Sequence, residues 1–278
     1  MGRSGGTISI SRKEERQNSG EGRIIGLLDA KVKQAELSMR EYLNKCLVSG
    51  EVSSATFVPY QSDGGVNGLN PLGYFLRKDP TTDPVRGGNV GNISGSTYTW
   101  WRPRFGDLNN TTPSSGDFGI SSCTTYAKYK VALRRMYNYC SRGSGGAPDL
   151  CVTDQTSFET YENALDANIR YQNTKMADMG FDTIKLRGAT CIWDEVMPDI
   201  ETGVAYDSDS YAAGTWFYLN TNFYKLMIDS ETDLITTPFV TPQDQTARTA
   251  AILFMGQAGV SNLRKHGVLW GGSLTITS

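Results

Sequence analysis

Histidine is nearly absent from this sequence, because His266 is the only one among 278 residues. A hydrolase built on a Ser-His-Asp or Cys-His arrangement would have to use that residue as its base, and no Gly-x-Ser-x-Gly segment accompanies it. Cysteine is also scarce, and no Cys-x-x-Cys pair occurs, so the three or four clustered ligands of a zinc site are not recognisable. We interpret the five cysteines as reduced core residues: Cys46, Cys123, Cys140, Cys151 and Cys191.

The sequence has neither an excess of one charge nor a long apolar run. Its 27 Lys and Arg residues face 29 Asp and Glu residues, and no basic run exceeds two residues, so the pattern does not predict a protein that coats nucleic acid. The longest nearly apolar stretch, residues 250–260, is shorter than the roughly 18 to 20 residues of a membrane span. The first residues lack the apolar run of a signal peptide. We therefore expect no membrane partner and a reducing, cytosolic folding compartment.

The sequence patterns that could indicate a phosphate-binding or metal-binding site are also weak. The Gly-rich segment 143–146 follows a predicted helix instead of preceding one, which indicates a turn and not a phosphate cradle. Asp194 and Glu195 would point to opposite faces of a strand, and Asp207 and Asp209 lack the Gly and distal Glu of a calcium loop. We interpret these carboxylates as solvated turn residues. The prediction is a protein that is not an enzyme, with no catalytic, cofactor-binding or metal-binding residue and no cofactor.

The clearest periodic pattern predicts a long helix over residues 20–47. Asn18 and Glu21 form a plausible capping box, and apolar residues then recur at alternating spacings of three and four. A coiled coil is the alternative, but several of these side chains are poor seam residues, which favours a helix that lies across a sheet. The predicted apolar face contains Ile25, Leu28, Val32, Ala35, Met39, Tyr42 and Cys46.

Other segments predict an α+β fold with a large antiparallel share. A strand is expected at residues 7–11, and a long irregular excursion rich in Gly, Asn, Ser, Thr and Pro at residues 49–119. Its Trp100 and Trp101 could stack on a ligand, although buried anchoring of the loop is the favoured interpretation. Further helices are expected at residues 124–139 and, capped by Thr156 and Glu159, at residues 156–171. Further strands are expected at residues 149–153, 182–186, 189–193, 215–219, 224–228, 248–262 and 267–270.

Eight short stretches remain that carry no catalytic or metal-binding pattern. They are ERQNSGE at 15–21, KQAEL at 33–37, STYTWWR at 96–102, VTDQT at 152–156, DMGF at 178–181, YLNT at 218–221, ILFMGQ at 252–257 and SNLRKHGV at 261–268. Together they resemble the major capsid proteins of tailed bacteriophages, because they occur in that family's order with plausible spacings, from about residue 7 to residue 270.

The resemblance implies the capsid fold that encapsulins share, with two domains and no enzymatic activity. A peripheral domain would comprise residues 7–48, with the long spine helix on antiparallel strands, and residues 216–278 would return to it. Residues 49–215 would form an axial domain. The implied function is a shell subunit that assembles into hexamers and pentamers of an icosahedral phage head. The alternatives are an encapsulin-like cargo shell, or a loop-rich enzyme or sugar-binding domain that uses residues 49–119.

The partners implied are other copies of the chain, portal and scaffold proteins of the head, and weak, non-specific contact with packaged double-stranded DNA. The implied location is the virion, after folding and assembly in the host bacterial cytoplasm. One departure concerns the N-terminus. The family places an N-terminal arm and an extended hairpin before the strand that matches residues 7–11, whereas only MGRSGG precedes it here. Either this chain is a truncated or mis-started version, or its shell is held together by other contacts.

Overall fold

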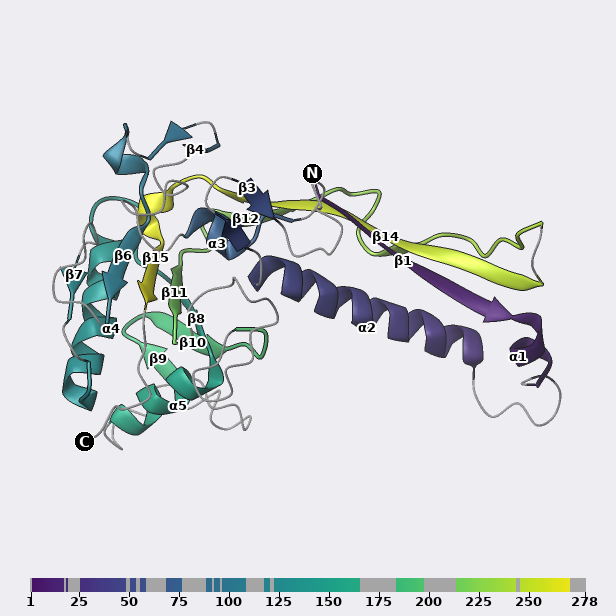
Figure 1. The fold of residues 1–278 in the computed structure, drawn as a ribbon, viewed down its shortest axis with the longest axis horizontal. Helices are drawn as coiled ribbons and strands as arrows, with labels where there is room; N and C mark the ends of the chain where they lie inside the picture. Colours follow the sequence, from purple (N-terminus) through teal and green to yellow (C-terminus); the bar gives the residue numbers. More distant parts are fainter. Residues whose placement is uncertain are drawn as a thin grey trace.

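The protein is described from a computed structural model. Figure 1 shows an elongated molecule in which a globular body continues into a long arm, and the body and the arm each contain a β-sheet. The structure describes residues 2–17, 19, 26–48, 51–53, 56–58, 69–76, 89–91, 93–95, 97–108, 118–120, 123–165, 184–197, 214–243 and 246–270.

The arm is built on a four-stranded antiparallel sheet. The strand predicted at residues 7–11 is confirmed as part of a longer one, β1 (Gly2–Ser11), which pairs with β14 (Ala247–Val260) over its whole length. On its other edge β14 pairs with β12 (Tyr224–Ile228) and β13 (Ile235–Thr236). Apolar and small polar residues alternate along β1, so Ile8 and Ile10 are buried while Thr7 and Ser9 are exposed. The alternation therefore places the apolar side chains of β1 on the covered face of the sheet and the polar ones on the exposed face.

A single long helix covers that face. This is α2 (Leu27–Val48), which lies along β1 in Figure 1. The prediction of a start at residue 20 is wrong, because Gly26 lies outside the helix and its carbonyl accepts the first helical hydrogen bond, from the N–H of Ala30 at 2.9 Å. The expected capping box at Asn18 and Glu21 lies outside the described residues. A short helix at the tip of the arm, α1 (Arg12–Gln17), was not predicted.

The predicted apolar face of α2 is buried only in the helix's C-terminal half. Met39 and Cys46 are buried, Ala35 and Val32 are half-buried, and Leu28 is 42% exposed. The expectation that this face is buried from Leu28 onward is therefore wrong. Farther along the helix, the terminal methyl of Met39 lies 3.7 Å from the position that a Cβ on Gly6 would occupy.

The body contains a seven-stranded mixed sheet in the order β7-β6-β15-β11-β8-β10-β9. Parallel pairs join β10 to β8, β15 to β6 and β6 to β7, and the others are antiparallel. The strands are β6 (Arg104–Asp107), β7 (Phe118–Gly119), β8 (Leu150–Thr153), β9 (Ile184–Leu186), β10 (Ala189–Trp193), β11 (Trp216–Leu219) and β15 (Gly267–Trp270).

Two strands differ from their expected place. Residues 216–219 and 267–270 were expected to return to the part that contains the long helix, yet β11 and β15 lie side by side within the body sheet. All four residues of β11 are buried. Such a continuous apolar run suits a strand that is covered on both faces, which is the environment of the body and not of the arm.

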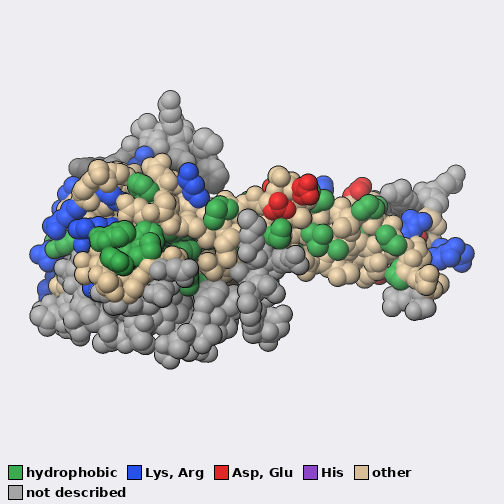
Figure 2. All heavy atoms as spheres, turned by 90° about the horizontal axis from the view of Figure 1, so that it is seen from above, with side chains coloured by type: hydrophobic (Ala, Val, Ile, Leu, Met, Phe, Trp, Pro, Cys, Tyr) green, Lys and Arg blue, Asp and Glu red, His purple; other side chains and the backbone are tan. Residues whose placement is uncertain are grey.

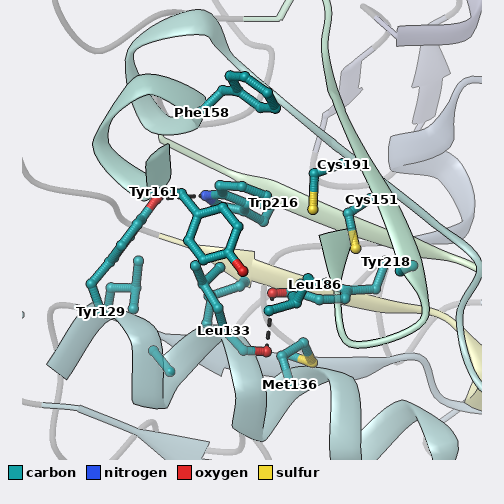
Figure 3. Close-up of a cluster of buried hydrophobic side chains, with 14 of the residues drawn as sticks. Tyr129, Leu133, Met136, Cys151, Phe158, Tyr161, Leu186, Cys191, Trp216 and Tyr218 are labelled. Carbon is teal, nitrogen blue, oxygen red and sulfur yellow. Dashed lines mark hydrogen bonds between the residues drawn. The ribbon is translucent and has the colours of Figure 1, made fainter. Parts of the chain in front are cut away.

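Helices α4 (Tyr126–Ser141) and α5 (Gln155–Ala164) pack on one face of the body sheet (Figures 1 and 3). The first matches its prediction closely and is capped by Thr125, whose side chain accepts from the N–H of Lys128. The second is capped by Asp154 and not by Thr156, because the Asp154 carboxylate accepts from the N–H of Ser157 at 3.0 Å. Its predicted extension to residue 171 is wrong, since Leu165 is already extended.

The body core lies between this sheet and these helices. Figure 3 shows the Trp216 ring against Tyr129 and Tyr161, and Trp216 Nε1 donates to the Tyr129 hydroxyl at 2.7 Å. The hydroxyl of Tyr218 donates to the Leu133 carbonyl at 3.2 Å. On the opposite face, Phe217 and Leu219 join the end of α2 and a short helix, α3 (Leu72–Phe75). A second core therefore links the body to the arm.

Within residues 49–119, the described residues form short elements. Trp101 is half-buried, and a hydrogen bond of 3.0 Å from its indole Nε1 to the Val90 carbonyl anchors it, so the anchoring is confirmed although the burial is partial. Trp100 is 54% exposed, so buried anchoring is wrong for it. The elements are β2 (Glu51–Ser53), β3 (Thr56–Val58), β4 (Asn89–Val90), β5 (Ile93–Ser94) and the 3-10 turn η1 (Thr99–Trp101); a second 3-10 turn, η2 (Leu263–Lys265), lies between β14 and β15.

Candidate functional site

The reactive side chains of the described residues are enclosed in the cores. All five cysteines are free and buried, and burial raises the pKa of the Cys123 thiol to about 11, so it is protonated at neutral pH. Among the described residues there is no group of three His, Cys, Asp or Glu side chains that could hold a metal ion. No described helix is long and apolar enough to cross a membrane.

His266 is fully buried between the body and the base of the arm. Its Nδ1 accepts a hydrogen bond from the backbone N–H of Asn220 at 3.2 Å, and the ring lies edge-on to Tyr224 with centroids 6.2 Å apart. Burial lowers the pKa of the imidazole to about 4. The ring is therefore neutral at physiological pH and acts as a hydrogen-bond acceptor inside the core.

Lys265 is also buried, with 2% of its surface exposed. Its ammonium donates to the backbone carbonyls of Arg142 and Gly143 at 3.0 Å and of Gly146 at 3.2 Å. Residues 143, 145 and 146 have positive φ angles of 85°, 113° and 85°, which glycine adopts without strain. The Gly-rich segment is a turn after a helix, as predicted, and it encloses a cation from its own chain. Lys265 is thus unable to contact a nucleic acid.

Two of the family-like motifs meet at this point. Asn220 belongs to YLNT at 218–221, and His266 to SNLRKHGV at 261–268. The side-chain Nδ2 of Asn220 donates to the Ala147 carbonyl at 3.0 Å and to the Gly145 carbonyl at 3.3 Å. Asn220 therefore ties β11 both to the glycine turn and to His266. The signal that could have revealed this role is a polar residue directly after a fully apolar strand.

Other motifs also hold the fold. In VTDQT at 152–156, Thr153 Oγ1 donates to the Thr215 carbonyl at 3.1 Å. In ILFMGQ at 252–257, the Gln257 side-chain oxygen accepts from the N–H of Asn70 at 2.8 Å. DMGF at 178–181 lies outside the described residues, as do parts of ERQNSGE at 15–21. The motifs whose contacts are described supply hydrogen bonds between strands, turns and helix ends.

Asp194 has a role that sequence reasoning missed. It was interpreted as a solvated turn residue, but its carboxylate accepts from Asn44 Nδ2 at 2.9 Å and from the N–H of Val196 at 2.8 Å. Asn44 lies on α2 in the arm, and Asp194 directly follows β10 in the body. This contact spans 150 residues of sequence, and it helps to fix the direction of the arm relative to the body.

Two surfaces of the described residues stand out. On the face of the arm sheet opposite α2, Leu253 points away from the buried Ile252 and Phe254, and its neighbours on that face are apolar and exposed as well. Scattered apolar side chains along the arm are visible in Figure 2. Exposed apolar side chains on one face of a sheet are suited to contact with another protein where they form a continuous patch. The exposed fractions are Leu253 40%, Ile235 46%, Met227 52% and Val240 63%.

The second surface is basic and lies on α4. Lys128, Arg134 and Arg135 are exposed, Lys130 is half-buried, and α4 contains no Asp or Glu. Figure 2 shows Lys and Arg side chains gathered at the body end of the molecule, where α4 lies in Figure 1, while Asp and Glu appear on the arm. These four basic residues are close in the sequence, and they lie on one helix that has no acidic residue.

Comparisons with solved structures identify the fold. A capsid protein of cyanophage A-1(L) matches with a TM-score of 0.54 and 11% identity over 100% of this chain and 78% of that one. The capsid of a native GTA particle matches with a TM-score of 0.53 and 12% identity, over 98% of this chain and 73% of that one. The capsid of Myoviridae phage XM1 matches with a TM-score of 0.52 and 13% identity, over 97% of this chain and 73% of that one. No protein-family model and no curated protein sequence matches the chain. The chain thus has the α+β fold of tailed-phage capsid proteins, as its motifs predicted.

Proposed function

We propose that this chain is the structural subunit of a tailed-bacteriophage head, and that it forms hexamers and pentamers of an icosahedral shell around double-stranded DNA. The observation that carries the proposal is the likeness to capsid structures over nearly the whole chain, arm included. The elongated arm supports the proposal, because apolar side chains of the arm stay exposed within one chain and are available for contact with neighbouring copies. A closed ring needs such contacts between different patches of the same subunit.

The proposal includes two functional parts. The arm, with α2 on its sheet, is the peripheral part, and the body is the axial part. We keep the division at residues 48 and 49 that the family resemblance implies, and we assign β11 and β15 to the body, because they pair in its sheet. The location that follows is the virion, after assembly in the host cytoplasm, with portal and scaffold proteins as further partners. The role is non-enzymatic, which agrees with the buried cysteines and the neutral, buried His266.

Electron microscopy and light scattering of the purified full chain test the proposal. Rings of five or six copies, or closed shells, are the expected result. Discrete monomers or dimers at all concentrations would contradict it and would favour a ligand-binding domain. Closed particles that retain a host protein as cargo, and that exclude DNA when purified from phage-producing cells, would replace the phage head with an encapsulin-like compartment.

A further inference from the structure

β1 forms an open edge of the arm sheet. It pairs with β14, and no other described strand pairs with it. Two hydrogen bonds reveal which residues face outward. The N–H of Arg12 donates to the Thr246 carbonyl, just beyond the β14 ladder, whereas the Ser9 carbonyl accepts from Lys31 Nζ at 3.2 Å on the helix side. Successive residues of a strand direct their backbone N–H and C=O groups to opposite sides. The backbone groups of the odd-numbered residues of β1 therefore point away from β14.

One end of this edge is closed by side chains. Lys31 occupies the Ser9 carbonyl and also pairs with Glu14 at 2.9 Å, and the Glu14 carboxylate accepts from the N–H of Ser11 at 3.2 Å. Before that point, the N–H and C=O groups of Gly5 and Thr7 and the N–H of Ser9 bond to no other residue in the described part of the chain. Gly5 and Thr7 are exposed. Proline and bulges, which usually protect such edges, do not occur along β1.

A groove of about 470 Å³ runs beside this open edge, between residues 5–9 of β1 and α2. The groove is open beside the small residues Gly6, Ala35 and Ser38, and the side chains of Met39 and Tyr42 form its apolar wall. Among the described residues that line the groove, Lys31 is the only charged one, and it is already paired with Glu14. The groove therefore suits an uncharged, extended segment with apolar side chains on one face, held by backbone hydrogen bonds.

The chain itself contains such a segment. Residues 271–278, outside the described part, read GGSLTITS: Leu274 and Ile276 alternate with Ser and Thr, and no residue is charged. The alternation resembles that of residues 7–10, TISI, in β1 itself. This segment follows β15, which lies in the body sheet, whereas the groove lies along the arm (Figure 1).

We infer that residues 273–277 of a second copy add as a strand to the open edge of β1 at residues 5–9, with Leu274 and Ile276 in the groove against Met39 and Tyr42. Five residues of each strand span about 17 Å at 3.4 Å per residue, so the lengths agree. The inference rests on the proposed function, because a shell brings the body of one copy beside the arm of another. The contact joins neighbouring copies through backbone hydrogen bonds.

Cross-linking between two populations tests the occupant. One full-length preparation carries Thr7→Cys and the other carries Thr275→Cys, and a short bismaleimide links thiols after mixing and assembly. The native cysteines are buried, so background is low. A covalent dimer should form at least tenfold more than in a control mixture with Lys13→Cys, an exposed residue of α1 outside the groove. Absence of this dimer, or links only within single chains of a Thr7→Cys/Thr275→Cys double variant, would overturn the inference.

A backbone variant tests the mode of binding. Thr7→Pro removes an outward N–H and leaves the bonds to β14 intact, because proline is tolerated on the free side of an edge strand. Thr7→Ala is the matched control that keeps the N–H. In this test Ser9→Cys on one copy is cross-linked to Thr275→Cys on the other. Thr7→Pro should reduce the yield of this cross-link at least tenfold, whereas Thr7→Ala should not reduce it. Thermal unfolding should be unchanged in both variants. An equal cross-link in both variants would overturn strand addition. Particles that form without the cross-link would leave the proposed function standing, whereas cross-linked oligomers without rings or shells would contradict that function alone.

Discussion

Asn44 in the long helix of the arm donates a hydrogen bond of 2.9 Å to the Asp194 carboxylate in the body. Asp194 also accepts from the N–H of Val196, so the carboxylate is held from the body side while Asn44 reaches it from the arm. If the chain forms the shell proposed above, a change in the angle between arm and body would change how neighbouring copies meet. A local hydrogen bond can therefore affect particle size without being needed for folding.

Asn44→Ala is expected to destabilise the chain by about 1.5 to 2 kcal/mol, the lower part of the roughly 1.5 to 3 kcal/mol that a hydrogen bond to a charged group contributes. Val196 still satisfies the Asp194 carboxylate, which limits the loss. Urea unfolding measures this change, and electron microscopy should show a broader distribution of particle sizes. Asn138→Ala, at an exposed position of α4, is the control and should change neither. Uniform, native-sized particles from Asn44→Ala would show that this contact does not set the angle.

A second prediction concerns pH. Burial lowers the pKa of His266 from about 6.5 to about 4, so the unfolded chain binds a proton on this residue between those values and the folded chain does not. Stability from this residue is therefore complete above about pH 6.5 and falls as the pH drops toward 4. The loss is about 3 kcal/mol on the scale of 1.36 kcal/mol per pKa unit.

Unfolding in urea at pH 7, 6, 5 and 4, compared with His266→Asn, isolates this contribution. An asparagine oxygen can accept the Asn220 N–H in place of Nδ1 and has no proton to gain, so the variant should lose less stability on acidification. Parallel pH curves for the two proteins would mean that His266 is solvated in the folded chain.

Much of the arrangement is visible in the sequence because it is local. Period-2 alternation located β1, and the Gly-rich segment 143–146 marked the C-terminal end of α4. The helix α1 was missed although Ser11 and Glu14 form a reciprocal capping box, with hydrogen bonds of 3.3 and 3.2 Å. Six residues are too few for a periodic signal, so only the cap could have revealed it.

What the sequence could not reveal depends on contacts between distant residues. Lys265 reaches its carbonyls across more than 100 residues, and a run of Arg264 and Lys265 looks the same in a sequence whether it is buried or exposed. Placement of β15 in the body sheet depends on parallel pairing with β6, which no local pattern encodes. The family-like motifs predicted the fold correctly, but their individual roles became clear only from these pairings.

The third prediction compares two positions on the long helix. Met39 is 6% exposed against Gly6 and Ile252, whereas Leu28 is 42% exposed. Met39→Asp would bury an unpaired carboxylate and should cost several kcal/mol, enough to yield insoluble protein. Leu28→Asp, which the periodic pattern alone predicts to be equally damaging, should remain soluble and lose less than about 1 kcal/mol. Soluble yield and urea midpoints of the two variants measure the difference. Equal damage would mean that the first turn of α2 is covered.

The last prediction concerns DNA and the basic side chains of α4. At about 0.15 M salt, isolated subunits should not retain duplex DNA measurably, because each phosphate contact adds only about 0.9 to the salt slope and few contacts are available per subunit. At about 0.02 M salt, weak retention should appear. The triple variant Lys128→Gln, Arg134→Gln and Arg135→Gln should remove most of it and lower the salt slope by about 2.7.

The matched control replaces three exposed basic residues of α1, Arg12, Lys13 and Arg16, by Gln, which changes the net charge by the same amount on the arm. If retention depended on net charge alone, both triple variants would weaken it equally. A larger effect of the α4 variant is expected, because α4 carries no acidic residue whereas α1 contains Glu14 and Glu15. Filter binding across a salt series distinguishes these outcomes. Micromolar retention at about 0.15 M salt that survives the α4 substitutions would show that a different surface binds DNA, and Lys265 would still not be that surface, since its ammonium is enclosed by three carbonyls.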